Sequence, residues 1–354
     1  MSKKTENSGV MTSQEFFRLA NNFYGTRNLA VDPLRYALDI DLTNYVAANR
    51  DTLKDRKKVA FVWICLNPPY WQFAADMLQG AREFFLPGHD TDFFLWSDIP
   101  RDGEGIVGVI NGFKALDPNY DEAQGIAQLT SLSRLIHEGM TVIPTEPVEW
   151  PMPTLMRYHL FLQQEEKLKD YDYIFYCDVD MKFVSVVGDE ILGNGLTAAL
   201  HPGYAIDKKF WPPYEPNRES ACYIPRPGKI IDDGGKPRFM PMYFAGGFQG
   251  GRAKDFIQAM KDMKKLIDRD FTKNYIPIWN DESAWNKYLF EHEPEIVLTP
   301  SYIFPDSLLE EYYYPLWGVR YPPKLMTLTK KFSTSKEGGA AAAQMIEQMK
   351  GLRK

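Results

Sequence analysis

The sequence has 354 residues, 44% hydrophobic and 25% charged, a composition typical of a folded globular protein. Its net charge of −6 and lack of a long basic run argue against a nucleic-acid partner, which would need lysine and arginine to neutralise phosphates. Three widely spaced cysteines exclude a disulfide scaffold and a zinc cluster. The N-terminus carries no apolar signal-peptide core and no run has the length of a membrane helix, so we expect a soluble, cytoplasmic protein.

The pattern of apolar residues divides the chain into three parts. Residues 1–57 are polar or weakly helical and predict an N-terminal extension. Residues 58–332 alternate between strand-like and helix-like patterns and predict one α/β domain. Residues 333–354 contain a Gly-Gly pair and an alanine run, which predict a flexible or helical C-terminal tail.

The α/β domain begins with a strand, a helix and a second strand. Val59–Leu66 is continuously apolar and rich in β-forming residues, as expected for a strand buried on both faces. After an Asn-Pro-Pro break, apolar residues recur at helical spacing from Trp71 to Phe85. Phe93–Trp96 predicts the next strand. This order is typical of a βαβ unit, which places its strands parallel in one sheet.

Helices and strands continue to alternate toward the C-terminus. We predict further helices at residues 121–137, 154–168, 253–267 and 282–291, and further strands at 140–143, 173–177 and 295–298. The proline- and aromatic-rich stretch 203–241 predicts loops and short strands. The fold class is therefore α/β, with a Rossmann-like mixed, mostly parallel sheet flanked by helices.

Asp178-Val179-Asp180 differs from the four other Asp-x-Asp triplets because it alone directly follows a continuous apolar strand. Open α/β sheets bind ligands at the carboxyl ends of their strands. Residues i and i+2 of an extended chain point the same way, so both carboxylates could hold one hard cation that also binds substrate phosphates. A strand end with helix-capping aspartates explains the local pattern equally well.

The segment 242–252 contains four glycines within six positions, between a predicted strand and a predicted helix. Its spacing fits neither the dinucleotide fingerprint nor the phosphate-binding P-loop. One interpretation is a tight packing turn, which the local pattern favours. The other is a sugar-sized pocket with Ala245, Gly246 and Gly247 at its floor.

Four further polar residues have both a structural and a functional interpretation. Asp281 and Glu282 lie at the start of a predicted helix, where acidic residues most often cap the helix. Alternatively, one of these carboxylates and the neighbouring Trp279 ring could face a bound sugar. His201 follows an apolar run at a turn, where a histidine is more often structural. Arg157 lies in an apolar helix and needs a carboxylate partner or a diphosphate.

Taken together and in order, these motifs resemble glycosyltransferase family 6, the histo-blood-group transferase family. The resemblance runs from about residue 59 to about residue 331 and is densest in YDYIFYCDVDMKF, LHPGY, YFAGGFQGG and WNDESAWNKYL, which begin at residues 171, 200, 243 and 279. It implies a GT-A catalytic domain at 58–332 that is a retaining hexosyltransferase. The implied reaction moves α-linked GalNAc or Gal from a UDP-sugar to the 3-OH of a galactose-terminated acceptor.

The resemblance also implies a role for each motif residue. Asp178 and Asp180 match the family's binding site for Mn²⁺, with Mg²⁺ as the alternative cation, and Glu282 matches the catalytic carboxylate. The residues that match donor- or UDP-binding positions are Tyr70, Arg157, Asp178, Val179, Asp180, Ala245, Gly246, Gly247, Asp281, and Lys330 or Lys331. The residues that match acceptor-binding positions are His201, Trp279 and Glu282.

Several departures from the family pattern affect these expectations. Many bacterial members carry Asn-x-Asn and need no metal, whereas this chain keeps Asp-x-Asp, so we expect metal dependence. A signal-anchor helix like that of the animal members is not found, which indicates a soluble microbial or viral type. Asn280 and Pro213 replace family residues of the acceptor site and leave the acceptor open, fucosylated or not. Two alternatives remain, namely a metal-dependent transferase for another UDP-hexose and an inactive UDP-sugar- or glycan-binding protein.

Overall fold

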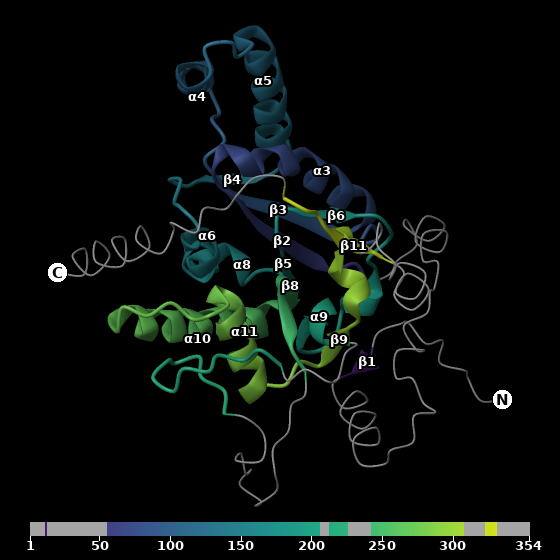
Figure 1. Cartoon of the computed structure of the whole chain (residues 1–354). Coiled ribbons are helices and arrows are strands. Elements are labelled where there is room, and N and C mark those ends of the chain that lie inside the picture. The colour runs from purple at the N-terminus through teal and green to yellow at the C-terminus, as the bar shows by residue number, and fades with distance from the viewer. Residues whose placement is uncertain (1–10, 13–54, 206–211, 226–241, 308–322, 331–354) are drawn as a thin grey trace, which may run out of the picture.

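The computed structural model describes residues 11–12, 55–205, 212–225, 242–307 and 323–330 (Figure 1). The predicted C-terminal tail lies outside the described residues, as does the N-terminal extension except for residues 11–12 and 55–57. The boundaries of these two parts therefore stay predictions. Lys331 also lies outside the described residues.

An eight-stranded mixed sheet forms the centre of the fold, in the order β1-β9-β7-β8-β5-β2-β3-β4 (Figure 1). Its strands are β1 (Met11–Thr12), β2 (Lys58–Cys65), β3 (Asp90–Ser97), β4 (Thr141–Pro144), β5 (Tyr173–Cys177), β7 (Leu196–Leu200), β8 (Phe244–Arg252) and β9 (Ile296–Leu298). Strands β5, β2, β3 and β4 pair in parallel, as do β7 and β9, whereas β8 is antiparallel to both of its neighbours and β1 is antiparallel to β9. The predicted mixed, mostly parallel sheet is confirmed.

Helices cover both faces of this sheet. They are α3 (Pro68–Phe84), α4 (Gly103–Leu116), α5 (Glu122–Gly139), α6 (Met152–Leu155), α7 (Arg157–Leu162), α8 (Glu165–Leu168), α9 (Pro202–Ala205), α10 (Ala253–Thr272) and α11 (Asn280–Glu291), with 3₁₀ turns η2 (Asp189–Ile191) and η3 (Pro300–Tyr302). In Figure 1, α4 and α5 project together from the body of the molecule. Among the described residues, no helix combines the length and apolarity of a membrane span.

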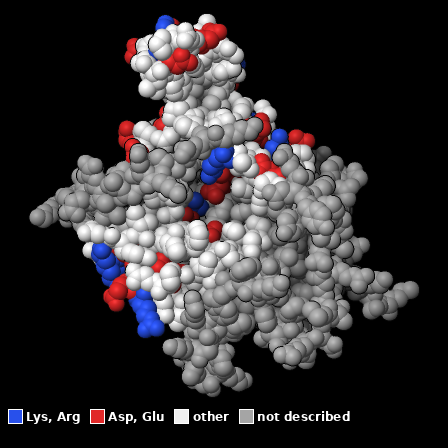
Figure 2. All heavy atoms as spheres, in the orientation of Figure 1, with Lys and Arg blue, Asp and Glu red and all other residues white. Residues whose placement is uncertain are grey.

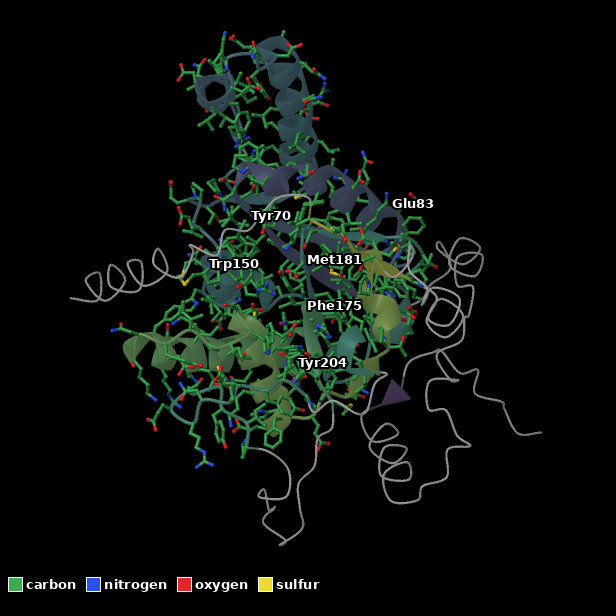
Figure 3. All side chains as sticks on the ribbon, viewed as in Figure 1. Tyr70, Glu83, Trp150, Phe175, Met181 and Tyr204 are labelled. Carbon is green, nitrogen blue, oxygen red and sulfur yellow. The ribbon has the colours of Figure 1, made fainter. Side chains whose placement is uncertain are left out.

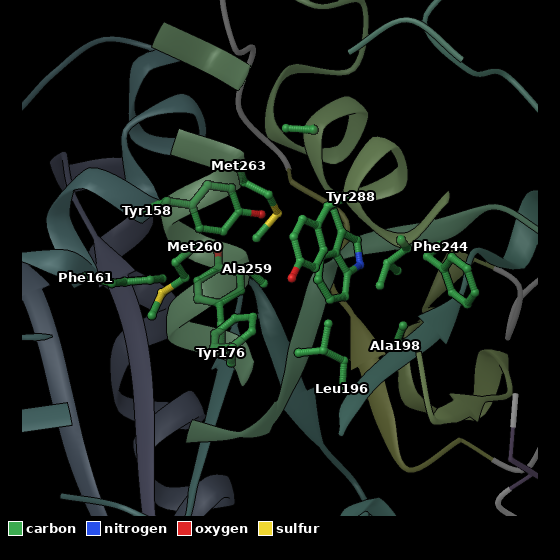
Figure 4. Close-up of a cluster of buried hydrophobic side chains, with 14 of the residues drawn as sticks. Tyr158, Phe161, Tyr176, Leu196, Ala198, Phe244, Ala259, Met260, Met263 and Tyr288 are labelled. Carbon is green, nitrogen blue, oxygen red and sulfur yellow. The ribbon is translucent and has the colours of Figure 1, made fainter. Parts of the chain in front are cut away.

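Alternating side chains of each strand supply two separate hydrophobic layers, as the two faces of a pleated strand require. On β2, Ala60 and Val62 belong to the layer that contains α7, α10 and α11, part of which is drawn in Figure 4. Phe61 and Trp63 belong to the opposite layer, which contains α3. This two-sided burial explains why β2 reads as a continuous apolar run.

A smaller three-stranded sheet lies beside the large one. It consists of β10 (Phe304–Pro305), β11 (Leu325–Thr327) and β6 (Met181–Phe183), in that order. Strand β11 is parallel to β10 and antiparallel to β6, with Thr327 opposite Met181. Because β6 closely follows Asp180, this small sheet places the end of β11 next to the Asp-x-Asp motif.

The structure differs from the sequence expectation at two helices. The helix predicted at 154–168 is three short helices, α6, α7 and α8, separated at Met156 and at Gln163–Gln164. Helix α4 was not predicted, since its four glycines lower its intrinsic helix propensity. It forms because Asp102 caps it through the Gly105 amide at 2.8 Å and because Ile106 and Ile110 are buried against its surroundings.

The glycine-rich segment is a strand, so its interpretation as a packing turn was wrong. Residues 244–252 form β8, which pairs with β5 and β7. A Cβ atom at Gly250 would lie 2.3 Å from Cδ1 of Phe175, and Gly251 has a φ of +134°. Glycine is therefore required at these positions because neighbouring strands approach too closely for a side chain.

Candidate active site

Figure 2 shows a hollow near the middle of one face, where acidic and basic side chains meet. A cleft forms where β2 and β5 end, the edge at which open α/β sheets bind ligands. Its lining residues are Ile64, Leu66, Asn67, Tyr70, Trp150, Pro153, Thr154, Arg157, Tyr176, Asp178, Val179, Asp180 and Lys330. The cleft thus contains six of the residues singled out from the sequence, including the Asp-x-Asp pair.

The Asp-x-Asp motif forms the connection between β5 and β6. Val179 and Asp180 lie in a turn, so the expectation of an extended backbone was wrong. The Asp178 amide donates to the Gly247 carbonyl at 2.9 Å, and the Leu328 amide donates to the Asp180 carbonyl at 2.8 Å. The turn is therefore held by β8 on one side and by the segment after β11 on the other.

Arg157 joins two carboxylates beneath the cleft. Its side chain is buried, with Nη2 at 3.2 Å from Oδ1 of Asp178 and Nη1 at 3.1 Å from Oδ2 of Asp281. Nη1 also donates to the Gly246 carbonyl at 3.0 Å, and the guanidinium lies 4.3 Å from the ring centroid of Tyr176. Burial alone would lower the pKa of Arg157, but Asp281 and Asp178 outweigh it and raise the net pKa, so this cation stays charged.

Asp281 and Glu282 face β8 at the start of α11. Oε2 of Glu282 accepts a hydrogen bond from the Gly246 amide at 2.7 Å, and α11 has no side-chain cap at Trp279. Burial raises the pKa of each carboxyl to about 7, partly offset by Arg157 at Asp281 and by Tyr243 and the Gly246 amide at Glu282. Neither carboxylate acts as a side-chain cap at the N-cap position of α11, so capping there does not explain the pair.

Gly246 and Gly247 bring the β8 backbone against carboxylates on opposite sides. A Cβ atom at Gly246 would lie 3.3 Å from Cβ of Glu282 and 3.5 Å from Oδ2 of Asp281. A Cβ atom at Gly247 would lie 2.9 Å from Oδ2 of Asp178. Both glycines therefore keep the space around the three carboxylates open.

We expect Gly247→Ala to lower kcat/KM at least about tenfold, because the added methyl group displaces the Asp178 carboxylate. The matched control is Gly112→Ala on α4, where a Cβ atom meets nothing within 4 Å. Steady-state kinetics of the two variants, with a UDP-sugar donor of the kind that the family resemblance implies, would check the effect. Equal kcat/KM values for Gly247→Ala and the control would contradict this account of the glycine.

Lys330 enters the cleft from the segment after β11. Its Nζ atom lies 2.8 Å from Oδ2 of Asp180 and 5.3 Å from the ring centroid of Tyr70. Tyr70 comes from α3 and Trp150 from the turn before α6 (Figure 3). One aromatic face, a lysine and an aspartate thus surround one end of the cleft.

His201 and Trp279 lie outside the lining of this cleft, beyond Glu282. The His201 ring packs 5.7 Å from that of Tyr243, whose hydroxyl interacts with Glu282. Burial lowers the pKa of His201 to about 4, so this imidazole is neutral at neutral pH. Trp279 is 44% exposed, and its Nε1 donates to the Pro213 carbonyl at 2.9 Å. His201 is thus linked to Glu282 through Tyr243, and the Trp279 carbonyl accepts from the Glu282 amide at 3.0 Å.

Sequence reasoning missed several residues of the cleft. Asn67 lies two residues after the end of β2, as the N-cap of α3, and has a φ of +74°. The Tyr176 hydroxyl donates to Oδ1 of Asp178. Trp150, 41% exposed, also lines the cleft. Asn67 could have been found by the argument used for Asp178, since it too lies at the carboxyl end of a buried strand.

The acidic pair fits a hard divalent cation in its chemistry. Among the described residues there is no cluster of three or more His, Cys, Asp or Glu side chains suited to a metal. Two carboxylates and no softer ligand match Mn²⁺ or Mg²⁺, which complete their shells with water and phosphate oxygens. Burial and then the charge of Asp178 raise the pKa of Asp180, and Lys330 partly offsets this rise.

The chain is similar to known proteins of one glycosyltransferase family. The family model "Glycosyltransferase family 6" matches residues 150–315. Rat histo-blood group ABO system transferases 1 and 2 are 37% and 35% identical, with 74% and 73% of this chain covered and 66% and 68% of theirs. Human globoside alpha-1,3-N-acetylgalactosaminyltransferase 1 is 25% identical, with 67% of this chain and 58% of that protein covered. The chain thus matches about three fifths to two thirds of the length of these relatives.

Proposed function

Because this chain belongs to glycosyltransferase family 6, we propose that it is a retaining hexosyltransferase that moves α-linked GalNAc or Gal from a UDP-sugar to the 3-OH of a galactoside. The observation that carries the proposal is Arg157. One buried guanidinium joins Asp178, on the diphosphate side, to Asp281, on the sugar side. The Arg157 guanidinium therefore holds the carboxylate proposed to face the diphosphate and the carboxylate proposed to face the donor sugar at a fixed separation.

The cleft lining would bind the uridine and the diphosphate of a UDP-sugar, whereas Asp281 and Glu282, assigned to the donor sugar, lie outside that lining and are joined to it through Arg157 and Gly246. Tyr70 offers a flat face for uracil, and Val179 lies where the ribose would pass. Asp178 and Asp180 would hold Mn²⁺, which when bound neutralises charge on the departing UDP. Lys330 adds a cation at Asp180 that can contact the diphosphate.

Glu282 would stabilise the positive charge that develops at the anomeric carbon of the donor sugar. The Gly246 amide fixes its carboxylate, so little reorganisation is needed during the reaction. Retaining transfer passes through an oxocarbenium-like state, which a nearby carboxylate favours. Asp281 would accept hydrogen bonds from donor hydroxyls while Arg157 holds it in place.

Acceptor binding is assigned to His201 and Trp279. A neutral imidazole can exchange hydrogen bonds with sugar hydroxyls, and the exposed indole offers an apolar face to a sugar ring. The acceptor is a galactose-terminated glycan, with or without fucose. Small residues at 245–247 favour UDP-GalNAc over UDP-Gal, although a pocket of this kind discriminates by only about 1–3 kcal/mol.

The pKa of the Glu282 carboxyl predicts how the rate depends on pH. Below the value of about 7 for Glu282, the carboxyl is protonated and the required anion is lost. We expect kcat/KM to fall about tenfold for each pH unit below 7. His201, with a pKa of about 4, does not titrate in this window. A kcat/KM profile that is flat between about pH 5.5 and 8 would contradict the role of Glu282 as an anion.

Titration calorimetry with UDP, in Mn²⁺ and in EDTA, tests the donor site directly. We expect tight binding only with Mn²⁺, and a loss of at least about tenfold in Asp180→Asn. The matched control is Asp76→Asn, an exposed aspartate 3.6 Å from Lys182, which should leave binding unchanged. Equal UDP affinity in EDTA would refute metal dependence. Transfer from a panel of UDP-hexoses then separates the proposed donors from UDP-glucose and from an inactive binding protein.

A further inference from the structure

The segment from Lys324 to Lys330 is fixed at both ends. At the start, Nζ of Lys324 lies 2.8 Å from Oε1 of Glu190, which is fully buried and also accepts from the Tyr302 hydroxyl at 2.9 Å. The segment then forms β11 between β10 and β6. A buried lysine paired with a buried carboxylate is costly to break, so this end of the segment is a firm anchor.

The other end is held by one aspartate that directly follows β10. Oδ2 of Asp306 accepts from the Thr329 amide at 2.8 Å, and Oδ1 accepts from the Thr329 hydroxyl at 2.5 Å. The Asp306 amide donates to the Thr327 carbonyl at 2.9 Å. Asp306 therefore makes three hydrogen bonds to the residues that lead into Lys330.

These contacts determine where the Lys330 side chain can reach. Lysine has a long, flexible side chain and loses entropy when it is held in one place. Lys330 nevertheless lies 2.8 Å from Asp180 and over the ring of Tyr70, in the cleft assigned to the donor. Because Thr329 precedes it directly, the clamp on Thr329 restricts the backbone from which Lys330 projects.

We propose that Asp306 is a positioning residue for the donor site: by clamping Thr329 it holds Lys330 against Asp180 and Tyr70, where the lysine can meet the diphosphate. The importance of this contact for transfer rests on the proposed function. Asp306 itself does not line the cleft and touches no part of the reacting centre. Its effect should therefore pass through the segment that it clamps, chiefly through Lys330 and to a smaller extent through the Leu328 amide, which donates to the Asp180 carbonyl.

The first test uses the protein without any ligand. Acetylation of lysines, followed by mass spectrometry, compares Lys330 with Lys265 on α10, which is 63% exposed and serves as an internal reference. In Asp306→Ala, we expect acetylation of Lys330 relative to Lys265 to rise about threefold or more, because the segment opens more often. The matched control is Asp102→Ala, which removes a comparable aspartate–amide hydrogen bond at α4 and should leave Lys330 unchanged. Unchanged reactivity of Lys330 in Asp306→Ala would overturn the proposal.

The second test measures the affinity for UDP with Mn²⁺ in a double-mutant cycle. Asp306→Ala should weaken binding about fivefold, and Asp306→Asn, which keeps one acceptor oxygen, should weaken it less. In the background of Lys330→Ala, the same substitution should cost less than about twofold. An equal loss in both backgrounds would show a merely structural role. If the wild-type protein fails to bind UDP, the proposed function fails, while the reactivity of Lys330 still decides the positioning role.

Discussion

Glu282→Gln is expected to lower kcat by at least about 10²-fold while UDP binding stays close to that of the wild type. Glutamine keeps an oxygen that can accept from the Gly246 amide, so the local structure is preserved. It removes the negative charge that would face the anomeric carbon. Steady-state and single-turnover kinetics with a saturating UDP-sugar would measure the effect.

The same helix provides a matched control for this substitution. Glu291→Gln neutralises a carboxylate at the end of α11 that is 48% exposed and pairs with Lys287. We expect its kcat to lie within about twofold of the wild-type value, since exposed ion pairs contribute little. Most of the wild-type kcat remaining in Glu282→Gln would exclude this carboxylate from the reaction.

Arg157→Met is expected to lower both the stability and the activity. Without the guanidinium, Asp178 and Asp281 lose their shared partner, and breaking a buried ion pair costs about 3–5 kcal/mol. Both carboxylates should then shift away from the donor, with a loss of at least about 10²-fold in kcat/KM. Chemical denaturation and kinetics on the same preparation measure the two effects.

Two further variants separate charge from geometry at this position. Arg157→Lys keeps the charge but cannot bridge two carboxylates with a planar group, so we expect it to recover stability more than activity. Arg134→Met removes an arginine that is 76% exposed and paired with Glu138, and it should change stability by less than about 0.5 kcal/mol. If Arg157→Met were as stable and active as Arg134→Met, the bridge would have no role.

The order of strands and helices could be predicted where burial gives a strong pattern. Val59–Leu66 and Tyr173–Cys177 are strands because both faces are buried, and this shows in the sequence as continuous apolar runs. Helix α4 and strand β8 could not be predicted, since their glycines have low propensity for either element and tertiary packing decides their structure.

The candidate site could be predicted in part for a similar reason. The position of Asp178 at a strand end follows from local pattern, and the resemblance to the family adds Glu282 and Lys330. The bridge from Arg157 to Asp281 spans 124 positions along the chain, so it depends on the tertiary structure that brings the first residue of α7 to the start of α11. Asp306 had no sequence signal, because its partner Thr329 is defined only by the pairing of β10 with β11.

The central claim is that this chain transfers a hexose with retention to a galactoside. The most direct test incubates the protein with UDP-GalNAc or UDP-Gal, Mn²⁺ and a galactose-terminated oligosaccharide, and determines the linkage of any product by NMR. We predict a new α-linked hexose on the 3-OH of galactose, formed by the wild-type protein and not by Glu282→Gln. A β-linked product, or UDP binding without any transfer to fucosylated and unfucosylated acceptors, would contradict the account.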